Sequence, residues 1–368
     1  MSTTNALPKY LLLAQELEGR IRDGDWAAGK VPTVRSIAQQ HEVSIVTSSR
    51  ALQVLRDKGL VNTVERSGCY LASPTQQRWA LCLRITPGPF QQASTAVNST
   101  GFEALAQRGQ ATFITDAFNL RDDIRDAELN RQARDAVASG LGGLFLLPAR
   151  VSEEAMRLDE RLLNACRDNG LPVVLVERNL RGVDRPLDCD LVCSDDMEGG
   201  RVCTQHLLQG GRRRIAFVLG SPTSSHRDRL AGYLYALHSS GATTTPFVLE
   251  QPADMPTREA YACLADRLVK HRADGVVCYQ DYTAIGIILE FLRRGLAVPR
   301  DIAVAGFDNL PIGDTFSIGV TTYAFPSEGV AANALRVMRE RIETPEAPPV
   351  KVVVAGSLIV RDSSGPAH

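Results

Sequence analysis

The segment VSIVTSSRALQVLRDKGLV, residues 43–61, places its hydrophobic positions along one face of a helix. A buried stripe at the i, i+3, i+4, i+7 spacing, with one serine as a small residue of the seam, comprises Ser48, Ala51, Leu52 and Leu55. Ser44 is placed to cap the start of this helix and Gly59 to end it. The outward face begins with hydroxyls and bare aliphatic side chains, which allow close approach to another surface, and the positive end of the helix dipole favours an anionic one. An ordinary amphipathic surface helix is the alternative.

Two shorter patterns precede this segment and predict two more helices. The apolar stripe of the first helix comprises Tyr10, Leu13, Leu17 and Ile21. Thr33 is placed to cap a short second helix that buries Ile37 and Ala38, and a tight turn leads from it into the third helix. Two short helices joined by such a turn form a helix-turn-helix, whose second helix enters the major groove of DNA.

An alternating segment follows the third helix. LVNTVERSGCYLA predicts a two-stranded hairpin around ERSG, the wing of a winged helix. Over about residues 8 to 72 the chain resembles the gluconate-repressor (GntR) family of winged-helix DNA-binding domains. The matching pattern is Y-x-x-L … I-x-x-G-x-W-x-x-G-x-x-P-T-x-R-x-I-A … V-S-x-x-T … A-L-x-x-L-x-x-x-G-L-V. The chain departs from the family at Ile45, where an arginine usually follows the Val-Ser pair, and in the wing, which usually reads G-x-G.

The resemblance implies that the start of the second helix, the first turn of the third and the wing tip face DNA. Hydroxyl side chains there suit contacts with phosphates, which position a protein without reading sequence. Ile45 and Val46 can read only thymine methyl groups. For Arg35 and Arg50 the alternative is a solvated arginine or an intramolecular ion pair. The candidate DNA-binding residues are Thr33, Arg35, Ser44, Ile45, Val46, Thr47, Ser49, Arg50, Arg66, Ser67 and Gly68.

From Trp79 onward, apolar runs alternate with amphipathic helical stretches. The strand candidates are WALCLRI, ATFIT, GGLFLLP, PVVLVE, DLVCS, RIAFVLG, PFVLE, GVVCY and IAVAGFD. Helix-length segments lie between most of them, including residues 122–139, 153–169, 198–209, 227–240 and 284–294. This alternation predicts parallel sheets covered by helices on both faces. Because roughly 290 residues follow the pattern, we expect an α/β domain with two parallel-sheet subdomains behind the winged helix-turn-helix.

Polar segments follow four of these strands, namely SDDMEGG, GSPTSSHRDRLAGY, CYQD and AGFDN. Ligands bind outside the carboxyl ends of the strands in such sheets, so these polar groups are expected to converge on a site. This region resembles the effector domain of lactose-repressor (LacI) family regulators, which is similar to periplasmic sugar-binding proteins, and implies that two-lobed fold. The matching motifs, from about residue 80 to 360, are S-D-x-x-x-G-G … H-L, G-G-R-R-R-I-A-F-V-L-G, R-x-R-L-A-G-Y, I-A-V-A-G-F-D-N and T-T-Y.

The resemblance implies that Arg229 and Asp308 bind the effector, helped by Ser225 and Gln280. A carboxylate can accept hydrogen bonds from two neighbouring hydroxyls, and a guanidinium donates a fork of N–H groups. A turn-capping role for Asp308 and an ion pair for Arg229 are the alternatives. The candidate ligand-binding residues are Phe90, Asp195, Ser225, Arg229, Tyr279, Gln280, Phe307 and Asp308, with Tyr282 as a further aromatic residue for stacking on a sugar ring.

Charge and composition narrow the class of protein. Residues 1–78 carry ten Lys and Arg against seven Asp and Glu, and the remaining residues carry 31 against 35. A basic small part on an acidic large part fits a head that binds a polyanion, although the excess is small. No apolar run is long enough to span a membrane and the N-terminus has no signal-peptide pattern, so we expect a cytoplasmic protein. The eight cysteines form no C-x-x-C pair and are expected to be reduced thiols rather than metal ligands.

A winged helix joined to a sugar-binding-like domain resembles the arabinose-repressor (AraR) type of regulator, in which these modules are fused. We expect a transcriptional repressor whose affinity for its operator is controlled by a small ligand, a sugar, bound between two lobes. Residues 1–72 would bind DNA, residues 73–78 would be the linker, and residues 79–368 would bind the effector and dimerise. Two winged helices on a symmetric core would read a palindromic operator.

A DNA-binding head fused to an enzyme domain acting on a small metabolite is the alternative. An aminotransferase-like enzyme needs a Schiff-base lysine near a strand end, and the large part has only Lys270, at the end of a surface helix, and Lys351, in a terminal strand. No Ser/His/Asp order, metal cluster or G-x-G-x-x-G loop appears, so neither catalytic residues nor a cofactor are expected. A transport protein fits poorly because of the DNA-binding head. The effector, the operator and the direction of control stay open.

Overall fold

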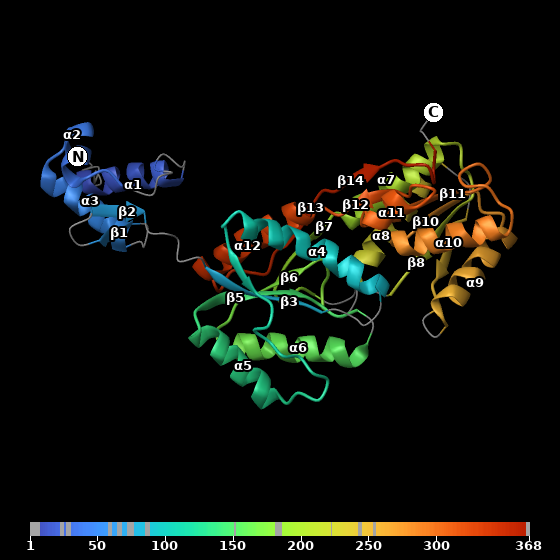
Figure 1. The fold of residues 1–368 in the computed structure, drawn as a ribbon, viewed down its shortest axis with the longest axis horizontal. Coiled ribbons are helices and arrows are strands. Elements are labelled where there is room, and N and C mark those ends of the chain that lie inside the picture. The colour runs from blue at the N-terminus through green and yellow to red at the C-terminus, as the bar shows by residue number, and fades with distance from the viewer. Residues whose placement is uncertain are drawn as a thin grey trace, which may run out of the picture. The chain divides into compact units, whose positions relative to one another are not determined.

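The computed structural model forms two compact units, Met1–Gln77 and Arg78–His368 (Figure 1). It describes residues 8–22, 26, 31–57, 61–64, 68–71, 77–84, 89–150, 152–180, 186–221, 223–241, 245–252 and 255–365. The first unit is a winged helix-turn-helix and the second is a two-lobed α/β domain. The segment SPTQQR, which we expect to be the linker, lies mostly outside the described residues.

The small unit contains the three helices and the hairpin that the sequence predicts. They are α1 (Lys9–Arg22), α2 (Val34–Gln40), α3 (Ile45–Asp57), β1 (Val61–Val64) and β2 (Gly68–Leu71), with β1 and β2 antiparallel. The stripe of α3 is fully buried and packs against Leu13 and Leu17 of α1. The Ser48 hydroxyl donates to the Val34 carbonyl over 3.1 Å and ties α3 to α2, which explains a polar residue in this stripe. The prediction of a helix-turn-helix is confirmed.

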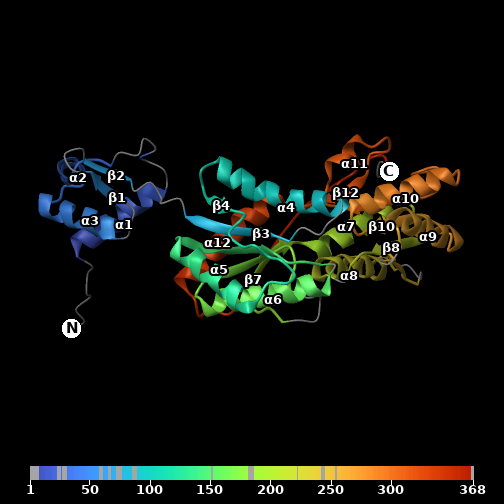
Figure 2. The ribbon, with the colours of Figure 1, turned by 60° about the horizontal axis from the view of Figure 1, so that its bottom comes forward.

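The first lobe of the large unit is a six-stranded parallel sheet in the order β13-β7-β6-β5-β3-β4. Its strands are β3 (Arg78–Leu83), β4 (Thr112–Ile114), β5 (Leu141–Leu147), β6 (Val173–Val176), β7 (Asp190–Ser194) and β13 (Lys351–Val354). Its helices are α4 (Pro89–Gln107), α5 (Asp126–Ala138), α6 (Glu153–Asp168) and α12 (Ser327–Glu343). One face of the sheet packs against α5 and α6 and the other against α4 and α12 (Figure 2). Helices therefore cover both faces of the sheet, as the near-continuous apolar strands predict.

The second lobe is a six-stranded sheet in the order β14-β12-β11-β10-β8-β9, parallel except for β14. Its strands are β8 (Ile215–Leu219), β9 (Phe247–Glu250), β10 (Gly275–Cys278), β11 (Ala303–Phe307), β12 (Thr321–Ala324) and β14 (Ser357–Ile359). Its helices are α7 (Asp196–Gln209), α8 (Ser224–Ser239), α9 (Thr257–Lys270), α10 (Asp281–Arg293) and the short α11 (Pro311–Thr315). One face packs against α9 and α10, and the other against α7 and α8. Two sheets, each with its own pair of cores, confirm the predicted fold class.

The chain passes between the lobes three times: after β7, after β12, and between β13 and β14. The strand β12 was not among the apolar candidates, because its sequence TTYA begins with two threonines. Both are fully buried. The Thr321 hydroxyl donates to the Arg361 carbonyl over 3.1 Å, and this hydrogen bond offsets the cost of burying a polar group. The strand is therefore buried although its sequence lacks a continuous apolar pattern.

Two glycine positions allow α7 and α8 to cross in backbone contact. A Cβ atom at Gly200 would lie 1.9 Å from the Arg229 carbonyl oxygen, and one at Gly232 would lie 2.0 Å from the Met197 carbonyl oxygen. These glycines belong to the S-D-x-x-x-G-G and R-x-R-L-A-G-Y motifs. The close crossing brings Arg229, on α8, to Asp196, at the start of α7.

We expect Gly232→Ala to lower the free energy of unfolding by at least about 1–3 kcal/mol, because the new methyl group meets backbone that cannot yield. Alanine is the better helix former by about 1 kcal/mol, so propensity alone predicts the opposite sign. The matched control is Gly313→Ala, whose Cβ would make contacts of 3.6 Å or longer. Urea denaturation measures both variants. Equal stabilities would show that α7 and α8 do not depend on this contact.

Candidate functional site

The first candidate site is the surface at the starts of α2 and α3. Thr33 caps α2, because the Ser36 N–H donates to its Oγ1 over 3.2 Å. Ser44 caps α3, because the Thr47 N–H donates to its Oγ over 3.1 Å, and the hydroxyls of Ser44 and Thr47 lie 2.8 Å apart. Both predicted caps are confirmed. The cap at α3 places hydroxyls beside the positive end of the helix, where phosphate oxygens are favoured.

Large aliphatic side chains extend from this first turn into solvent. The side chains of Ile45 and Val46 are 56% and 64% exposed, and Ser49 follows them on the exposed face. Exposed aliphatic residues at a helix start gain nothing for folding. They suit a surface that another molecule covers.

The arginines near this surface differ in their surroundings. Arg35 on α2 is exposed. Arg50 on α3 is exposed too, and its guanidinium lies 6.0 Å from the ring centroid of Tyr10, a cation–π contact rather than the ion pair considered above. Gly68 begins β2. The other two wing residues, Arg66 and Ser67, lie outside the described residues.

The second candidate site centres on Arg229, which is 3% exposed. Its Nε donates to Asp196 Oδ1 over 2.7 Å, and its Nη2 donates to Asp308 Oδ1 over 3.2 Å. Its Nη1 donates to the carbonyl of Tyr279. The guanidinium carbon lies 4.4 Å from the centroid of the Phe307 ring. The structure thus brings Arg229 and Asp308 together, and it adds Asp196 as the closer partner.

Three charged residues of the first lobe interact electrostatically with one another and with the residues around Arg229. Glu177 follows β6 and accepts a hydrogen bond from Arg178 Nη2 over 2.7 Å, while Arg178 Nη1 donates to the Pro148 carbonyl over 2.7 Å. Arg150 follows β5; its charge adds to that of Arg178 in lowering the pKa of Glu177 in its own lobe, and it opposes the rise that burial causes in the pKa of Asp308 in the other. We call these six residues the interlobe charge cluster: Arg150, Glu177, Arg178, Asp196, Arg229 and Asp308.

The backbone is strained at two positions of the cluster. Glu177 has φ 70° and Asp308 has φ 91°, in the left-handed region that side chains rarely occupy. Each residue directly follows a central strand, β6 in one lobe and β11 in the other. Such conformations cost about 1–3 kcal/mol each and concentrate at ligand sites, so they make this end of both sheets the candidate ligand site.

Burial governs the protonation of the cluster. Burial raises the pKa of Asp308 and of Asp196, and Arg229 opposes the shift in both. Burial would also raise the pKa of Glu177, but Arg178 and Arg150 hold it below its usual range. Burial and the charge of Arg229 lower the pKa of His226 well below its usual value, so this imidazole is neutral at neutral pH.

Two of the predicted ligand residues use their polar atoms within helices. Asp195 caps α7 by accepting the Glu198 N–H over 2.9 Å. Ser225 is buried in the first turn of α8, and its hydroxyl lies 3.1 Å from that of Thr223. These contacts fix the N-terminal ends of the two helices, α7 and α8, that carry Asp196 and Arg229.

Of the remaining predicted residues, Tyr279 contacts Arg229 through its carbonyl, and Gln280 contacts Tyr279. Gln280 Nε2 donates to the Tyr279 hydroxyl over 3.1 Å, and the Tyr279 ring lies 4.7 Å from that of His226. Gln280 Oε1 is buried and has no hydrogen-bond partner among the described residues. Tyr282 is half-buried in the first turn of α10. Phe90 lies in the first turn of α4, and its side chain is outside the described part of the structure.

Sequence reasoning missed Asp196 and the whole contribution of the first lobe. The signal was present, because LLPAR and VLVERN place Arg150, Glu177 and Arg178 after buried strands, as AGFDN places Asp308. The rule that ligands bind at the carboxyl ends of strands applies equally to both sheets.

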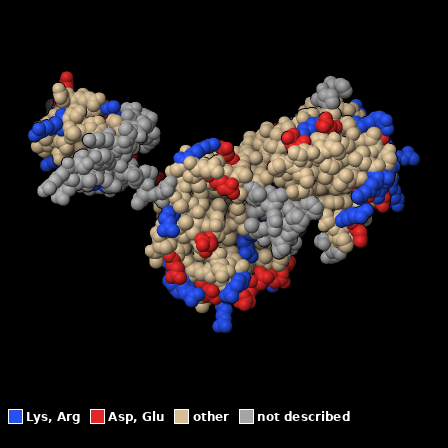
Figure 3. Space-filling view, in the orientation of Figure 1, with Lys and Arg blue, Asp and Glu red and all other residues tan. Residues whose placement is uncertain are grey.

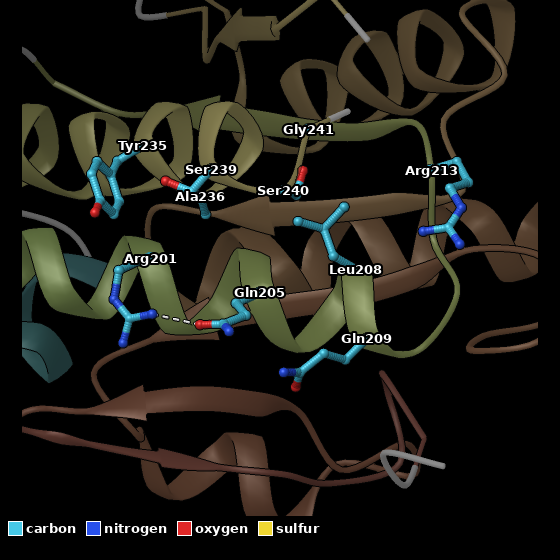
Figure 4. A pocket seen from close by; sticks show the side chains of 10 residues that line it. All are labelled: Arg201, Gln205, Leu208, Gln209, Arg213, Tyr235, Ala236, Ser239, Ser240 and Gly241. Carbon is cyan, nitrogen blue, oxygen red and sulfur yellow. Dashed lines mark hydrogen bonds between the residues drawn. The ribbon is translucent and has the colours of Figure 1, made fainter. Parts of the chain in front are cut away.

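A separate surface groove of about 790 Å³ lies between α7 and α8 (Figure 4). Its lining residues are Arg201, Gln205, Leu208, Gln209, Arg213, Tyr235, Ala236, Ser239, Ser240 and Gly241. Arg201 is already engaged there by Glu198 and Gln205. None of the sequence-predicted site residues lines this groove.

The surface over α5 and α6 carries interspersed acidic and basic side chains (Figure 3). Arg161 pairs with Asp126 at 2.6 Å and Arg157 with Glu153 at 3.2 Å, so the positive charge is locally compensated. Of the two lysines considered for a Schiff base, Lys351 pairs with Asp228 at 3.0 Å and Lys270 is exposed at the end of α9. Neither belongs to the interlobe charge cluster. Among the described helices, none is long and apolar enough to cross a membrane.

Two family models match the chain. Residues 9–71 match the bacterial regulatory proteins of the gntR family. Residues 204–364 match the periplasmic binding protein-like domain. The arabinose metabolism transcriptional repressor of Geobacillus stearothermophilus is 26% identical over 97% of this chain and 98% of that protein.

Solved structures resemble the large unit. The transcription regulator CcpA of Lactococcus lactis superimposes with a TM-score of 0.60 at 19% identity, covering 78% of this chain and 99% of that one. A LacI family regulator from Enterococcus faecium, solved with bound ribose, gives a TM-score of 0.59 at 21% identity, with 78% and 99% covered. These likenesses confirm the LacI-type fold.

Proposed function

The chain is a DNA-binding transcriptional regulator that joins a gntR-family head to a periplasmic binding protein-like domain, and we propose how it works. Residues 1–72 bind an operator, residues 73–78 link the parts, and residues 79–368 bind an effector and dimerise. The effector is a small polyhydroxylated molecule, a sugar or sugar derivative, which controls operator affinity from between the lobes. The protein acts as a repressor in the cytoplasm. Its relatives are regulators rather than enzymes.

The interlobe charge cluster is the observation that carries the ligand proposal. It gathers carboxylates and guanidinium groups at the carboxyl ends of both sheets, and beside it lies the Gln280 amide oxygen, which has no hydrogen-bond partner among the described residues. Hydroxyls both donate and accept hydrogen bonds, so a polyol can satisfy this mixture of groups. The relative from Geobacillus stearothermophilus is a repressor of arabinose metabolism, which supports a sugar.

The first test is binding of sugars with and without Asp308. We expect Asp308→Asn to weaken the binding of a stabilising sugar at least about tenfold, because unmet ligand donors cost about 1–3 kcal/mol each. Asparagine tolerates the left-handed backbone at this position, whereas alanine would add strain. A thermal-shift screen with L-arabinose, D-ribose, D-glucose and D-galactose selects the sugar, and calorimetry measures its affinity. Asp314→Asn, at an exposed carboxylate of α11, is the control.

Equal affinities of wild type and Asp308→Asn would remove Asp308 from the site and leave it a turn residue. In parallel, a gel shift with DNA from upstream of the gene tests the head. A sugar that binds without altering the gel shift would contradict control of operator affinity.

We also expect a homodimer held by the large unit. One winged helix reads too few bases for useful specificity, whereas two on a symmetric core read a palindrome. Sedimentation at micromolar concentration, with and without operator DNA, measures the mass. A stable monomer in both conditions would refute the palindromic model.

A further inference from the structure

We propose that the effector carries one carboxylate, which makes it a sugar acid such as an aldonate or a uronate, and that Arg150 binds this carboxylate. This inference rests on the proposed function, because it names the chemical class of the ligand held between the lobes. The motive is an imbalance within the interlobe charge cluster. One of its three arginines has no ion-pair partner among the residues that the structure describes.

The three arginines differ in their partners. Arg229 contacts two carboxylates, and Arg178 pairs with Glu177. Arg150 forms neither an ion pair nor a hydrogen bond with any residue that the structure describes. Arg150 follows β5, the neighbour of β6, and Arg178 Nη1 donates to the Pro148 carbonyl two residues before it, so Arg150 lies at the same sheet end as Glu177. Its charge acts on Glu177 in this lobe and on Tyr279 and Asp308 in the other. Arg150 is thus the arginine of the cluster that has neither an ion pair nor a hydrogen bond within the described part of the chain.

A desolvated cation without a partner is unfavourable for the folded protein. Burial and the neighbouring charge of Arg178 lower the pKa of the half-buried Arg150, and Glu177, Tyr279 and Asp308 oppose this shift only in part. A ligand anion beside Arg150 would offset both the burial of its charge and the repulsion from Arg178. This interaction would contribute to the affinity for the ligand. The arrangement is therefore better suited to the complex than to the ligand-free protein.

The second lobe offers acceptors for hydroxyl groups. Gln280 Oε1 is buried with no partner in the described part of the chain, and Asp308 is a carboxylate, so both can accept hydrogen bonds that ligand hydroxyls donate. The ligand therefore needs hydroxyl donors toward the second lobe and one anionic group toward Arg150. A sugar acid provides both on one small molecule.

The charge count favours a carboxylate over a phosphate. Three carboxylates, Glu177, Asp196 and Asp308, already accompany the three arginines. A ligand with a single negative charge meets Arg150 with limited repulsion from these groups. A phosphate with close to two negative charges would meet the same carboxylates at about twice the repulsion.

Calorimetric titration of the full-length chain with matched ligand pairs tests the proposal. The pairs are D-galacturonate and D-galactose, D-glucuronate and D-glucose, and D-arabinonate and D-arabinose, with D-glucose 6-phosphate as the phosphate arm. At least one acid is expected to bind at least about tenfold more tightly than its neutral partner. Arg150→Gln should abolish this preference, so that the acid and its neutral partner then bind with affinities within about twofold of each other.

Two further variants test whether the effect is specific to Arg150 and whether it depends on charge alone. Arg157→Gln removes an arginine of the exposed surface of α6 and should leave every affinity unchanged. Arg150→Lys keeps the charge and loses the planar fork, so it should bind the acid with intermediate affinity. The ligand-free melting temperature of Arg150→Gln should equal or exceed that of wild type, because a half-buried charge without an ion pair among the described residues is removed.

Each other outcome overturns a defined part of the proposal. Neutral sugars that bind as tightly as the acids, or an acid affinity unchanged in Arg150→Gln, would refute the carboxylate and leave the proposed function intact. Tighter binding of the phosphate through Arg150 would replace the carboxylate by a phosphate. If neither acids nor neutral sugars bind, the sugar assignment fails and this inference fails with it.

Discussion

Arg229→Met is expected to lower the free energy of unfolding by about 3–5 kcal/mol at neutral pH, because it strands two buried carboxylates. In the wild type the guanidinium donates to both Asp196 and Asp308 from a position that is 3% exposed. Methionine fills a similar volume but offers neither carboxylate a donor or a charge. Urea denaturation with intrinsic fluorescence measures the loss. The control Arg157→Met, on the exposed surface of α6, should change stability by less than about 0.5 kcal/mol.

The pH dependence gives this prediction a sign. Burial raises the pKa of Asp196 and of Asp308 above the unfolded values, and removal of Arg229 also removes the force that opposes the shift. A group with a raised pKa in the folded state stabilises the fold below its unfolded pKa and loses that contribution as the pH rises. The deficit of Arg229→Met should therefore grow between pH 5 and pH 8. Adding Asp196→Asn to this variant should recover part of the loss, and a deficit that is independent of pH and of Asp196 would contradict the ion-pair explanation.

The elements that the sequence predicted well are those whose periodicity matches their burial. The strands β5, β6, β8 and β11 are near-continuous apolar runs in the sequence, and the stripe of α3 follows the helical spacing. Both kinds of pattern are buried in the structure. The strand β12 was not predicted, because its buried threonines use their hydroxyls in hydrogen bonds and a hydrophobic pattern does not reveal such bonds. The close crossing of α7 and α8 was not predicted either, because the contacts that require glycine at these two positions are visible only when both helices are in place.

The candidate ligand site was only half predictable. The polar segments after β7, β8, β10 and β11 identified the residues of the second lobe, and Arg229 and Asp308 do lie in contact. Asp196 follows Asp195 directly, and only the structure shows that the first residue caps a helix while the second pairs with an arginine. The contribution of the first lobe depends on which strand ends face each other, which is a property of the three crossings between the lobes.

The candidate DNA-binding surface likewise contains residues that stabilise the fold and residues that do not. The caps at Thr33 and Ser44 follow from the sequence because each satisfies a backbone N–H of its own helix. The exposure of Ile45 and Val46 contributes nothing to the core of the small unit. A residue that is free of structural roles gives the sharpest test of function, because its replacement leaves the fold unchanged.

Val46→Glu is accordingly expected to weaken operator binding at least about a hundredfold while leaving the fold as stable as in the wild type. A carboxylate at this position would meet DNA phosphates, and like charges held together at an interface cost several kcal/mol, where each 1.4 kcal/mol is a factor of ten. The same carboxylate lies in the first turn of α3, where the helix dipole favours it by about 0.3–1 kcal/mol, so the melting temperature should not fall. Fluorescence anisotropy with a labelled fragment of upstream DNA measures the affinity. Val350→Glu, at a valine of the large unit that is 44% exposed, adds the same charge as a control and should bind DNA normally. If Val46→Glu bound the operator as tightly as this control, α3 would be an ordinary surface helix and another face of the small unit would have to contact DNA.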